Sequence, residues 1–541
     1  MTVFRSSMIM ASGTVVSRIL GLVRTVMLAY AIGVTTNVAD AFGVANQLPN
    51  NVYAIVVGGL LNAVLVPQIV RARVRKDGGK QYIDGLLTVI ISVFAVLTIL
   101  ATAAAPLLVR LYTTGWDQQT LALATAFAYW CLPQLFFYGL YSILGEVLNA
   151  RSSFGPYMWA PVLNNVVAIA GLGVFIGLFG PSSMGSVDQW GSGSISILAG
   201  TATAGVASQA LILFFFWKRI GLRFTFNFKL RGLGLRPALK AAGWTLAMLT
   251  ITQLGGLIQT NLTSSTLAAR AGETNGSLAS VAVSGTAWLI FMIPHSVGTV
   301  SIVTAYFTRI SKHAHDHDWD KLRTDVIQAI RSILFLSLIA SALIIVLCMP
   351  IARVFALQYQ PSVALATVLV AMTIGLVPFS INFMLQRVFY ALEDTKSPFV
   401  FTTIQILVFV SGAFLASKFI SAIYLVAAIS LAMSLSFVVQ AALSYRLLSK
   451  KIGHIFNAKL TRYWLQVFGA AIVAGIIAII TVWVLGGVGE QSFALSSTAG
   501  ALVTSLAAGT TGVLTYLVIL NALGNHELTS VWKKFKGIAR R

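Results

Sequence analysis

The chain has 541 residues, of which 57% are hydrophobic and only 10% are charged. Soluble domains carry about 25% charged residues, so this composition excludes an ordinary soluble protein. The formal net charge of +22 comes from 37 Lys and Arg against 15 Asp and Glu. No stretch alternates like a barrel strand, and we therefore predict an all-α polytopic membrane protein.

Apolar runs of membrane length recur along the whole sequence. A membrane helix needs about 20 apolar residues, and about fourteen runs have this length. They are predicted at 8–33, 39–70, 82–111, 120–150, 157–180, 192–217, 238–268, 277–308, 326–348, 362–391, 398–417, 420–445, 462–486 and 493–522. No small-residue cleavage site follows the first run, so we expect a retained helix and not a signal peptide.

The first run holds two arginines, Arg18 and Arg24, near its middle. An arginine at the centre of a membrane helix costs roughly 2.5–3.5 kcal/mol on insertion scales. Such charges normally face a bundle interior or a water-filled cavity, so both are candidate binding residues for an anionic substrate. Gly13, Ser17 and Gly21 form a small-residue ridge that is typical of close helix packing. Ser17 and Gly21 are also candidates for an interface between moving lobes.

The second run carries a polar stripe. Asp40, Gln47 and Asn50 recur at helical spacing with Gly43, Ala54, Gly58 and Asn62, which places them along one helical face. With Asn51, these polar residues are candidates for substrate binding. Asp40 lies a short loop after the first helix, where it could pair with Arg24 or gate access to it. The alternative is that Asp40 caps a helix N-terminus and the amides bond to neighbouring helices.

Prolines and charges indicate where the helices bend and how they are oriented. Pro49 should kink the second helix, and Pro133, Pro294 and Pro378 are candidate hinges. With a cytoplasmic N-terminus, 30 of the 37 Lys and Arg fall on the cytoplasmic side and 4 on the opposite side. The positive-inside rule thus predicts that both termini are cytoplasmic. The basic charge fits contact with anionic membrane lipids, and no soluble domain is long enough to bind nucleic acid.

The two halves of the sequence echo each other. Residues 143–157 read ILGEVLNARSSFGPY, and residues 384–399 read MLQRVFYALEDTKSPF. Glu146 in the first copy aligns with Arg387 in the second, and both are candidates for a gating or lobe-interface role, as is Pro49. A parallel repeat is typical of transporters that rock around a central site. We predict an N-terminal lobe at 1–220, a C-terminal lobe at 221–450, and two more helices with a basic tail at 451–541.

Acidic residues and enzyme motifs are informative through their absence. From the seventh predicted helix onward, all Asp and Glu fall in connections or at the terminus. This disfavours a cation-coupled exporter, which usually needs a membrane carboxylate. The run from His313 to Asp320 is expected to be a solvated linker, and we predict no metal site. No Walker, hydrolase or zinc-protease motif occurs, so we expect a transporter without a cofactor and not an enzyme.

Several motifs together resemble the MurJ (MviN) family of lipid II flippases. They are the segment from Ser17 to Arg24, Ala39-Asp40-Ala41-Phe42, Leu48-Pro49-Asn50, GGLLNAVLVP at 58–67, Leu148-Asn149-Ala150-Arg151, Ala160-Pro161 through Asn165, and QRVFYALEDTKSP at 386–398. The resemblance implies the fold of the multidrug/oligosaccharidyl-lipid/polysaccharide (MOP) exporter superfamily, with two six-helix lobes around a central cavity. It also implies transport of the undecaprenyl-diphosphate-linked peptidoglycan precursor in the bacterial cytoplasmic membrane. Arg18, Arg24 and Asp40 match family positions regarded as essential.

The sequence also departs from the family pattern. Better-known members carry further arginines where this chain reads Asn51-Val52-Tyr53-Ala54 and Trp288-Leu289-Ile290-Phe291. Some members have sodium-binding carboxylates in the second lobe, which this chain lacks. The resemblance therefore implies a lipid II flippase, and the arginines of the first run, without a driving-ion carboxylate in the second lobe, predict alternating access driven by membrane potential. A flippase for another polyprenyl-diphosphate oligosaccharide and a cation-coupled multidrug exporter stay open, and proteins of cell-wall synthesis or division are candidate partners.

Overall fold

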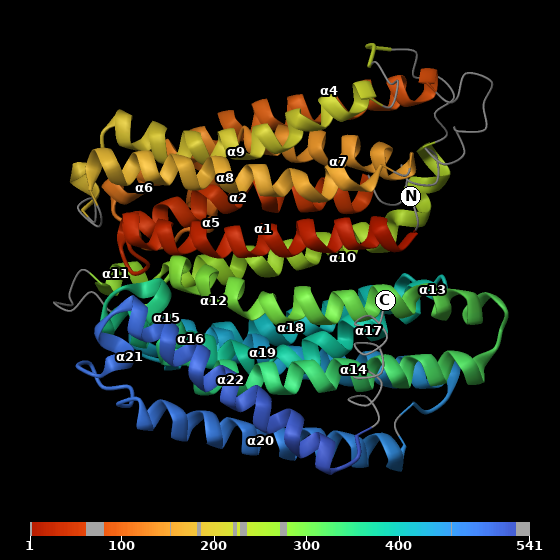
Figure 1. Cartoon of the computed structure of the whole chain (residues 1–541). Coiled ribbons are helices and arrows are strands. Elements are labelled where there is room, and N and C mark those ends of the chain that lie inside the picture. The colour runs from red at the N-terminus through yellow and green to blue at the C-terminus, as the bar shows by residue number, and fades with distance from the viewer. Residues whose placement is uncertain are drawn as a thin grey trace. The chain divides into compact units, whose positions relative to one another are not determined.

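The computed structural model describes residues 3–60, 80–151, 153–180, 186–219, 224–227, 235–270, 278–455 and 457–525 (Figure 1). Within these ranges the regular structure is helical throughout, which confirms the predicted all-α class. Asn62 of the predicted polar stripe, the end of the predicted second span and the basic tail from residue 526 onward lie outside the described residues.

The described helices are those of a multi-pass membrane protein. Eleven helical segments are long and apolar enough to cross a membrane, and a bent pair of helices, α16 and α17, makes a twelfth if it is one span. Their outward side chains suit lipid, since Ile99 is 68% exposed and Phe419 is 78% exposed. The two other predicted spans contain α2 and α10, which are helical but rich in Asn, Gln and Thr. The count of fourteen therefore stays a prediction.

The chain divides into two compact units, and the first consists of Met1–Gly272 with Ser280–Ala282. Within this unit α1 packs along α8, α8 packs along α9, and α2 packs against α6 and α10. Its elements are α1 (Val3–Ile32), α2 (Asn37–Leu60), α4 (Lys80–Ala103), α5 (Ala105–Tyr112), α6 (Gln118–Cys131), α7 (Gln134–Ala150), α8 (Phe154–Phe179), the 3₁₀ turn η2 (Val187–Gln189), α9 (Ser192–Arg219), α10 (Leu235–Ser264) and α11 (Thr266–Arg270).

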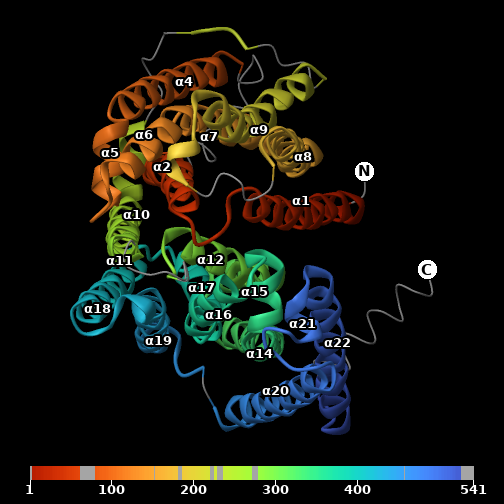
Figure 2. The ribbon, with the colours of Figure 1, turned by 90° about the vertical axis from the view of Figure 1, so that its left-hand side faces the viewer.

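The second unit consists of Glu273–Ala279 and Val283–Arg541. Its elements are α12 (Val281–Pro294), which begins in the first unit, the π-helix η3 (His295–Thr299), α13 (Val300–His315), α14 (Trp319–Val346), α15 (Cys348–Ala356), α16 (Tyr359–Thr373), α17 (Leu376–Ala391), α18 (Lys396–Phe419), α19 (Ala422–Ile452), α20 (Ala458–Val484), α21 (Phe493–Ser496) and α22 (Thr498–Ala522). Figure 2 shows α18 beside α19, and α20 beside α22. The predicted lobe boundary at 220/221 differs from this division, because α10 packs with α2 and α5.

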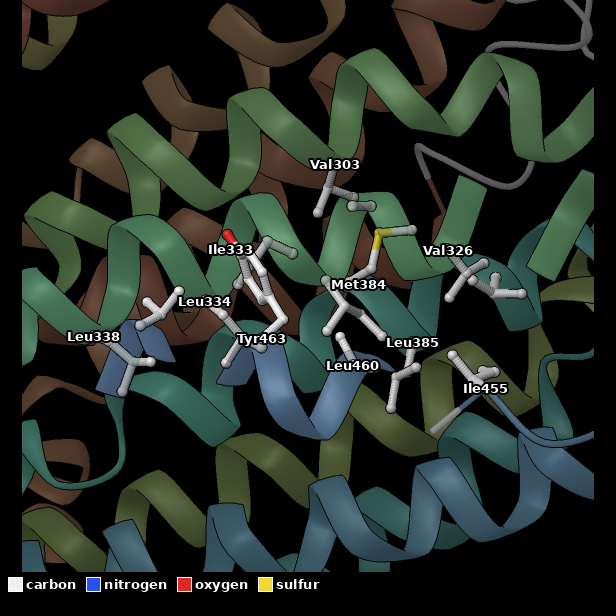
Figure 3. Close-up of a cluster of buried hydrophobic side chains, with 14 of the residues drawn as sticks. Val303, Val326, Ile333, Leu334, Leu338, Met384, Leu385, Ile455, Leu460 and Tyr463 are labelled. Carbon is white, nitrogen blue, oxygen red and sulfur yellow. The ribbon is translucent and has the colours of Figure 1, made fainter. Parts of the chain in front are cut away.

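Helix α14 forms the packing centre of the second unit. Its residues Val326, Ile330 and Ile333 are fully buried in a cluster to which α13, α17 and α20 also contribute. Val326 and Ile333 are labelled in Figure 3. In a membrane, close packing of this kind holds helices together, since lipid tails are as apolar as the side chains. The first turns of α14 also carry Asp325, which was predicted to lie in a connection between two membrane helices. The helix begins at Trp319, earlier than predicted, because Asp318 accepts a hydrogen bond from the backbone N–H of Lys321.

Prolines mark breaks in the helices at three of the four predicted positions. Helix α6 ends just before Pro133, and α12 gives way to the π-helix η3 directly after Pro294. Helices α16 and α17 are bent by 43° at a break three residues before Pro378. At Pro49, in contrast, α2 stays helical on both sides.

Candidate anion-binding site

A polar cavity of about 150 Å³ lies inside the first unit, among α1, α2, α7, α8 and α9. Its polar lining consists of Arg24, Asn46, Gln134, Tyr138 and Asn164, and the remaining lining is apolar or Thr. The volume has room for a phosphate-sized group or a few waters, but not for a disaccharide-pentapeptide. The cavity is thus a local subsite within one unit.

Hydrogen bonds fix the polar wall of this cavity. The side-chain amide of Gln134 donates to Asn46 Oδ1 at 3.2 Å and to Thr203 Oγ1 at 3.1 Å, and its carbonyl accepts from the Tyr138 hydroxyl at 3.1 Å. The Asn164 amide donates to Gln209 Oε1 at 2.9 Å. The amides and the phenol are thus held in place by one another.

Arg24 supplies the positive charge of the cavity. Its side chain is half-buried on α1, and it makes no ion pair with a carboxylate of the described residues. A guanidinium carries five N–H donors in a planar fork that matches carboxylate and phosphate oxygens. The cavity is therefore suited chemically to an anion, and above all to one with several oxygens.

The other residues of the first helix lie differently. Arg18 is exposed on α1, and its six-residue separation from Arg24 turns it by about 120° around the helix and moves it about 9 Å along the axis. Ser17 contacts α8, because Asn165 Nδ2 donates to its backbone oxygen at 2.9 Å and to its hydroxyl at 3.2 Å. A Cβ placed on Gly21 would lie 4.0 Å from Asn165. The small-residue ridge thus packs α1 on α8, and a role for Ser17 and Gly21 at a lobe interface stays a prediction.

Asp40 is fully buried at the start of another helix. Its Oδ1 accepts a hydrogen bond of 2.8 Å from the backbone N–H of Ala282, the second residue of α12. A carboxylate at this position satisfies a free N–H and complements the positive end of the helix dipole. This geometry agrees with the helix-cap interpretation. A direct role of Asp40 in substrate binding stays a prediction, and Asp40 is not part of the cavity lining among the described residues.

The remaining candidate residues of α2 differ in their surroundings. Asn51 donates to the Tyr112 hydroxyl at 3.2 Å, and its backbone oxygen accepts from Gln253 of α10 at 2.7 Å. Gln47 is half-buried, Asn50 is exposed and Pro49 is buried. The amide that reaches the cavity is instead that of Asn46, one residue before Gln47 of the predicted stripe.

Glu146 and Arg387, aligned by the predicted repeat, both lie on a helix that follows a break. Glu146 is half-buried on α7, near Tyr53 and Tyr157. Arg387 on α17 stacks over the rings of Phe383 at 5.2 Å and Phe307 at 5.9 Å. In both units the next helix carries Pro at its third position, Pro156 in α8 and Pro398 in α18. Their predicted gating roles stay predictions.

Sequence reasoning missed Asn46, Gln134 and Tyr138. Each is a polar residue in an otherwise apolar segment, which is a weak signal when taken alone. Gln134 follows directly after Pro133, so the break that begins α7 places its amide at the wall of the cavity. The broken segment, together with a long polar side chain at its start, was the available signal.

Comparison with known proteins identifies the family. The family model described as lipid II flippase MurJ matches residues 28–503, which confirms the resemblance seen in the motifs. The chain belongs to the MurJ family. A probable lipid II flippase MurJ from Rickettsia prowazekii is 26% identical over 415 residues, which cover 75% of this chain and 77% of the relative.

Solved structures share the fold of this MurJ-family chain. A lipid II flippase MurJ in an inward closed conformation matches with a TM-score of 0.72 and 20% identity, over 95% of this chain and 98% of that chain. A multidrug resistance MATE family transporter of the MOP superfamily matches with a TM-score of 0.59 and 18% identity, over 82% and 99%. These identities establish the fold alone. The predicted MOP-type architecture is therefore confirmed.

Proposed function

We propose that this protein is a lipid II flippase, which moves the undecaprenyl-diphosphate-linked peptidoglycan precursor from the cytoplasmic to the outer leaflet. One observation carries the proposal: in this member of the MurJ family, Arg24 lines a polar cavity inside the first unit, and its guanidinium has no carboxylate partner among the described residues. A guanidinium at a cavity that is not neutralised by a described carboxylate can bind an anionic ligand, and the diphosphate is the anionic part of lipid II.

The two arginines take different parts in this proposal. Arg24 binds phosphate oxygens through its planar fork, while Asn46, Gln134 and Tyr138 hold the shape of the subsite. Arg18 is exposed on the same helix and attracts the headgroup before it reaches Arg24. The saccharide and peptide lie outside this small cavity, and the lipid tail stays in the bilayer. Asp40 on α2 accepts a hydrogen bond at the start of α12, and its part in substrate binding is a further proposal.

Membrane potential provides the driving force in this proposal, and the protein works by alternating access. With both termini in the cytoplasm, the exported headgroup carries about two negative charges outward, which is the direction that an inside-negative potential favours. At about 2.3 kcal/mol per charge and 100 mV, this releases roughly 4–5 kcal/mol. No driving-ion site is then needed.

The two rival functions predict different features. A cation-coupled multidrug exporter needs a carboxylate that is free to bind a cation in the membrane. In the described part of the second unit the buried Asp325 is paired with Arg309 and lies 3.4 Å from His313 Nε2. A flippase for another polyprenyl-diphosphate oligosaccharide would share the site of Arg24, and only its saccharide would differ.

Depletion and reconstitution together test the proposed function. Depleting the protein in its host should make lipid II accumulate on the cytoplasmic leaflet. In proteoliposomes that contain the purified protein, fluorescent lipid II should change leaflet faster under an imposed potential, and replacing sodium with potassium should alter little. Accumulation of a different lipid-linked oligosaccharide would reject the substrate, and strict sodium dependence would reject the driving force.

A further inference from the structure

Helices α18 and α19 lie side by side (Figure 1, Figure 2). A second, larger cavity of the second unit is lined by residues of these two helices. Its volume is about 610 Å³, and it opens beside the first turns of α18 and the last turns of α19. Ile404 of α18 faces Leu443 and Leu447 of α19 across an almost wholly apolar floor. This groove is separate from the cavity at Arg24, which belongs to the first unit.

Three basic residues line this groove. Arg446 and Lys450 are four residues apart and thus lie on one face of α19, while His454 follows the turn at Gly453. All three are exposed, and none forms an ion pair with a carboxylate of the described residues. The neighbouring Lys451 differs, since its Nζ lies 2.9 Å from Asp394 Oδ2. The groove thus keeps its positive charge for a ligand.

Ser449 adds a polar group to the same groove. Its Oγ is buried and has no hydrogen-bond partner among the described atoms, although the residue lines the cavity. A buried hydroxyl without a partner is costly, and a ligand oxygen would satisfy it. The cations and the hydroxyl of the groove together match a ligand that has an anionic group with oxygen acceptors at one end and an apolar body at the other.

The length of α19 sets the depth of the groove in the membrane. Its 31 residues extend for about 46 Å, whereas the hydrocarbon core is about 30 Å thick. If Ala422 lies at one boundary of the core, Arg446 lies about one turn beyond the other, at the headgroup level. The exposed side chains of Leu435 and Val438 continue from the groove along α19, so this helix face borders lipid.

We propose that this groove binds an anionic phospholipid of the leaflet predicted to be cytoplasmic. The acyl chain lies on the floor formed by Ile404, Leu443 and Leu447, and the phosphate lies between Arg446 and Lys450. Zwitterionic lipids, whose headgroup also carries a cation, bind more weakly, because the described residues of the groove lining include no carboxylate that could pair with this cation. This site is independent of the proposed flipping of lipid II, since it is defined by binding alone.

Native mass spectrometry of the full-length protein in detergent tests the proposal. The protein is titrated with dioleoyl-phosphatidylglycerol and, separately, with dioleoyl-phosphatidylcholine. Wild type should bind phosphatidylglycerol more tightly than phosphatidylcholine. In the double variant R446Q/K450Q the affinity for phosphatidylglycerol should fall about fivefold for each cation removed, roughly 25-fold in all. The matched control K459Q/R462Q removes the same charge from exposed positions of α20 outside the groove, and should keep the preference of wild type.

A second variant and a competitor make the result decisive. Ile404→Trp fills the groove without changing its charge, and it should weaken binding of phosphatidylglycerol while the melting temperature stays near that of wild type. Equal binding to R446Q/K450Q and to the control would overturn the site. An equal loss of phosphatidylglycerol affinity in both double variants would show that the preference depends on net charge and not on this groove. Displacement of phosphatidylglycerol from wild type by undecaprenyl phosphate at equal concentration would assign the groove to the substrate lipid instead.

Discussion

The charge of Arg24 can be changed in steps, and its position in the cavity sets the size of each expected effect. In Arg24→Lys the charge remains but the planar fork is lost, which removes about one charged hydrogen bond of 1.5–3 kcal/mol, or roughly 10- to 150-fold in flipping. Arg24→Gln removes the charge from a half-buried polar site. Losing one partner of a buried charge pair costs about 2–5 kcal/mol, which corresponds to roughly 30- to 5,000-fold. Arg24→Glu should abolish flipping.

The assay has to separate ligand binding from folding. Membrane abundance, melting temperature and flipping of fluorescent lipid II in proteoliposomes are measured for the three variants. Because arginine is costly inside a membrane helix, the Gln variant should insert at least as well as wild type. Arg110→Gln is the matched control, since this exposed residue lies on α5 outside the cavity lining. It should flip lipid II at the rate of wild type.

Two results would refute this reasoning. If Arg24→Gln is well folded and flips lipid II at nearly the wild-type rate, Arg24 does not bind the substrate. If abundance and melting temperature fall in proportion to activity, Arg24 instead stabilises the bundle through its polar neighbours. The anion-site proposal requires loss of flipping with a preserved melting temperature.

Three further predictions concern the fold and orientation. Asp40→Ala should lower stability by about 1–3 kcal/mol because it removes the carboxylate that accepts the hydrogen bond from the N–H of Ala282, whereas Asp40→Asn should retain most of the stability in thermal unfolding. An unchanged melting temperature with flipping abolished would favour substrate binding instead. Gly205→Ala should cost about 1–3 kcal/mol, since its Cβ would lie 2.5 Å from Asn164 Oδ1, while Gly173→Ala, with nothing within 4 Å, should be neutral in the same measurement. In a background without Cys131 and Cys348, cysteines at Gln119 and Gln491 should react with an impermeant thiol reagent in intact cells and those at His315 and Asn457 should not; the reverse pattern would invert the predicted orientation.

Much of the helical architecture was predictable because membrane helices follow from the length of apolar runs. The predicted spans at 192–217 and 398–417 correspond to α9 and α18 within a few residues. Contacts between helices that are distant in the sequence were not predictable. Helix α10 was placed in the C-terminal lobe, but Gln253 on it donates to the backbone of Asn51, and the helix packs in the first unit. Such a contact joins residues 202 positions apart and leaves no local pattern.

The candidate site was predictable in its charge but not in its walls. Arg24 stands out because a charged residue in an apolar run is rare. Asn46 and Gln134 are ordinary amides whose meaning depends on a hydrogen bond between residues 88 positions apart. The predicted stripe on α2 includes Gln47, whereas the neighbouring Asn46 lines the cavity. Helical spacing identifies which residues share a face, but not which helix packs against that face.

The ion pairs of the described residues differ between the two units. In the second unit the carboxylates of Asp320, Asp325 and Asp394 each lie against Arg or Lys, so these negative charges are neutralised within the protein. In the first unit the guanidinium of Arg24 has no carboxylate partner among the described residues. The charge left free to meet a ligand at the cavity is therefore positive. An inside-negative potential favours outward movement of the bound anion and inward return of the emptied, positive site, so one field assists both halves of the proposed cycle.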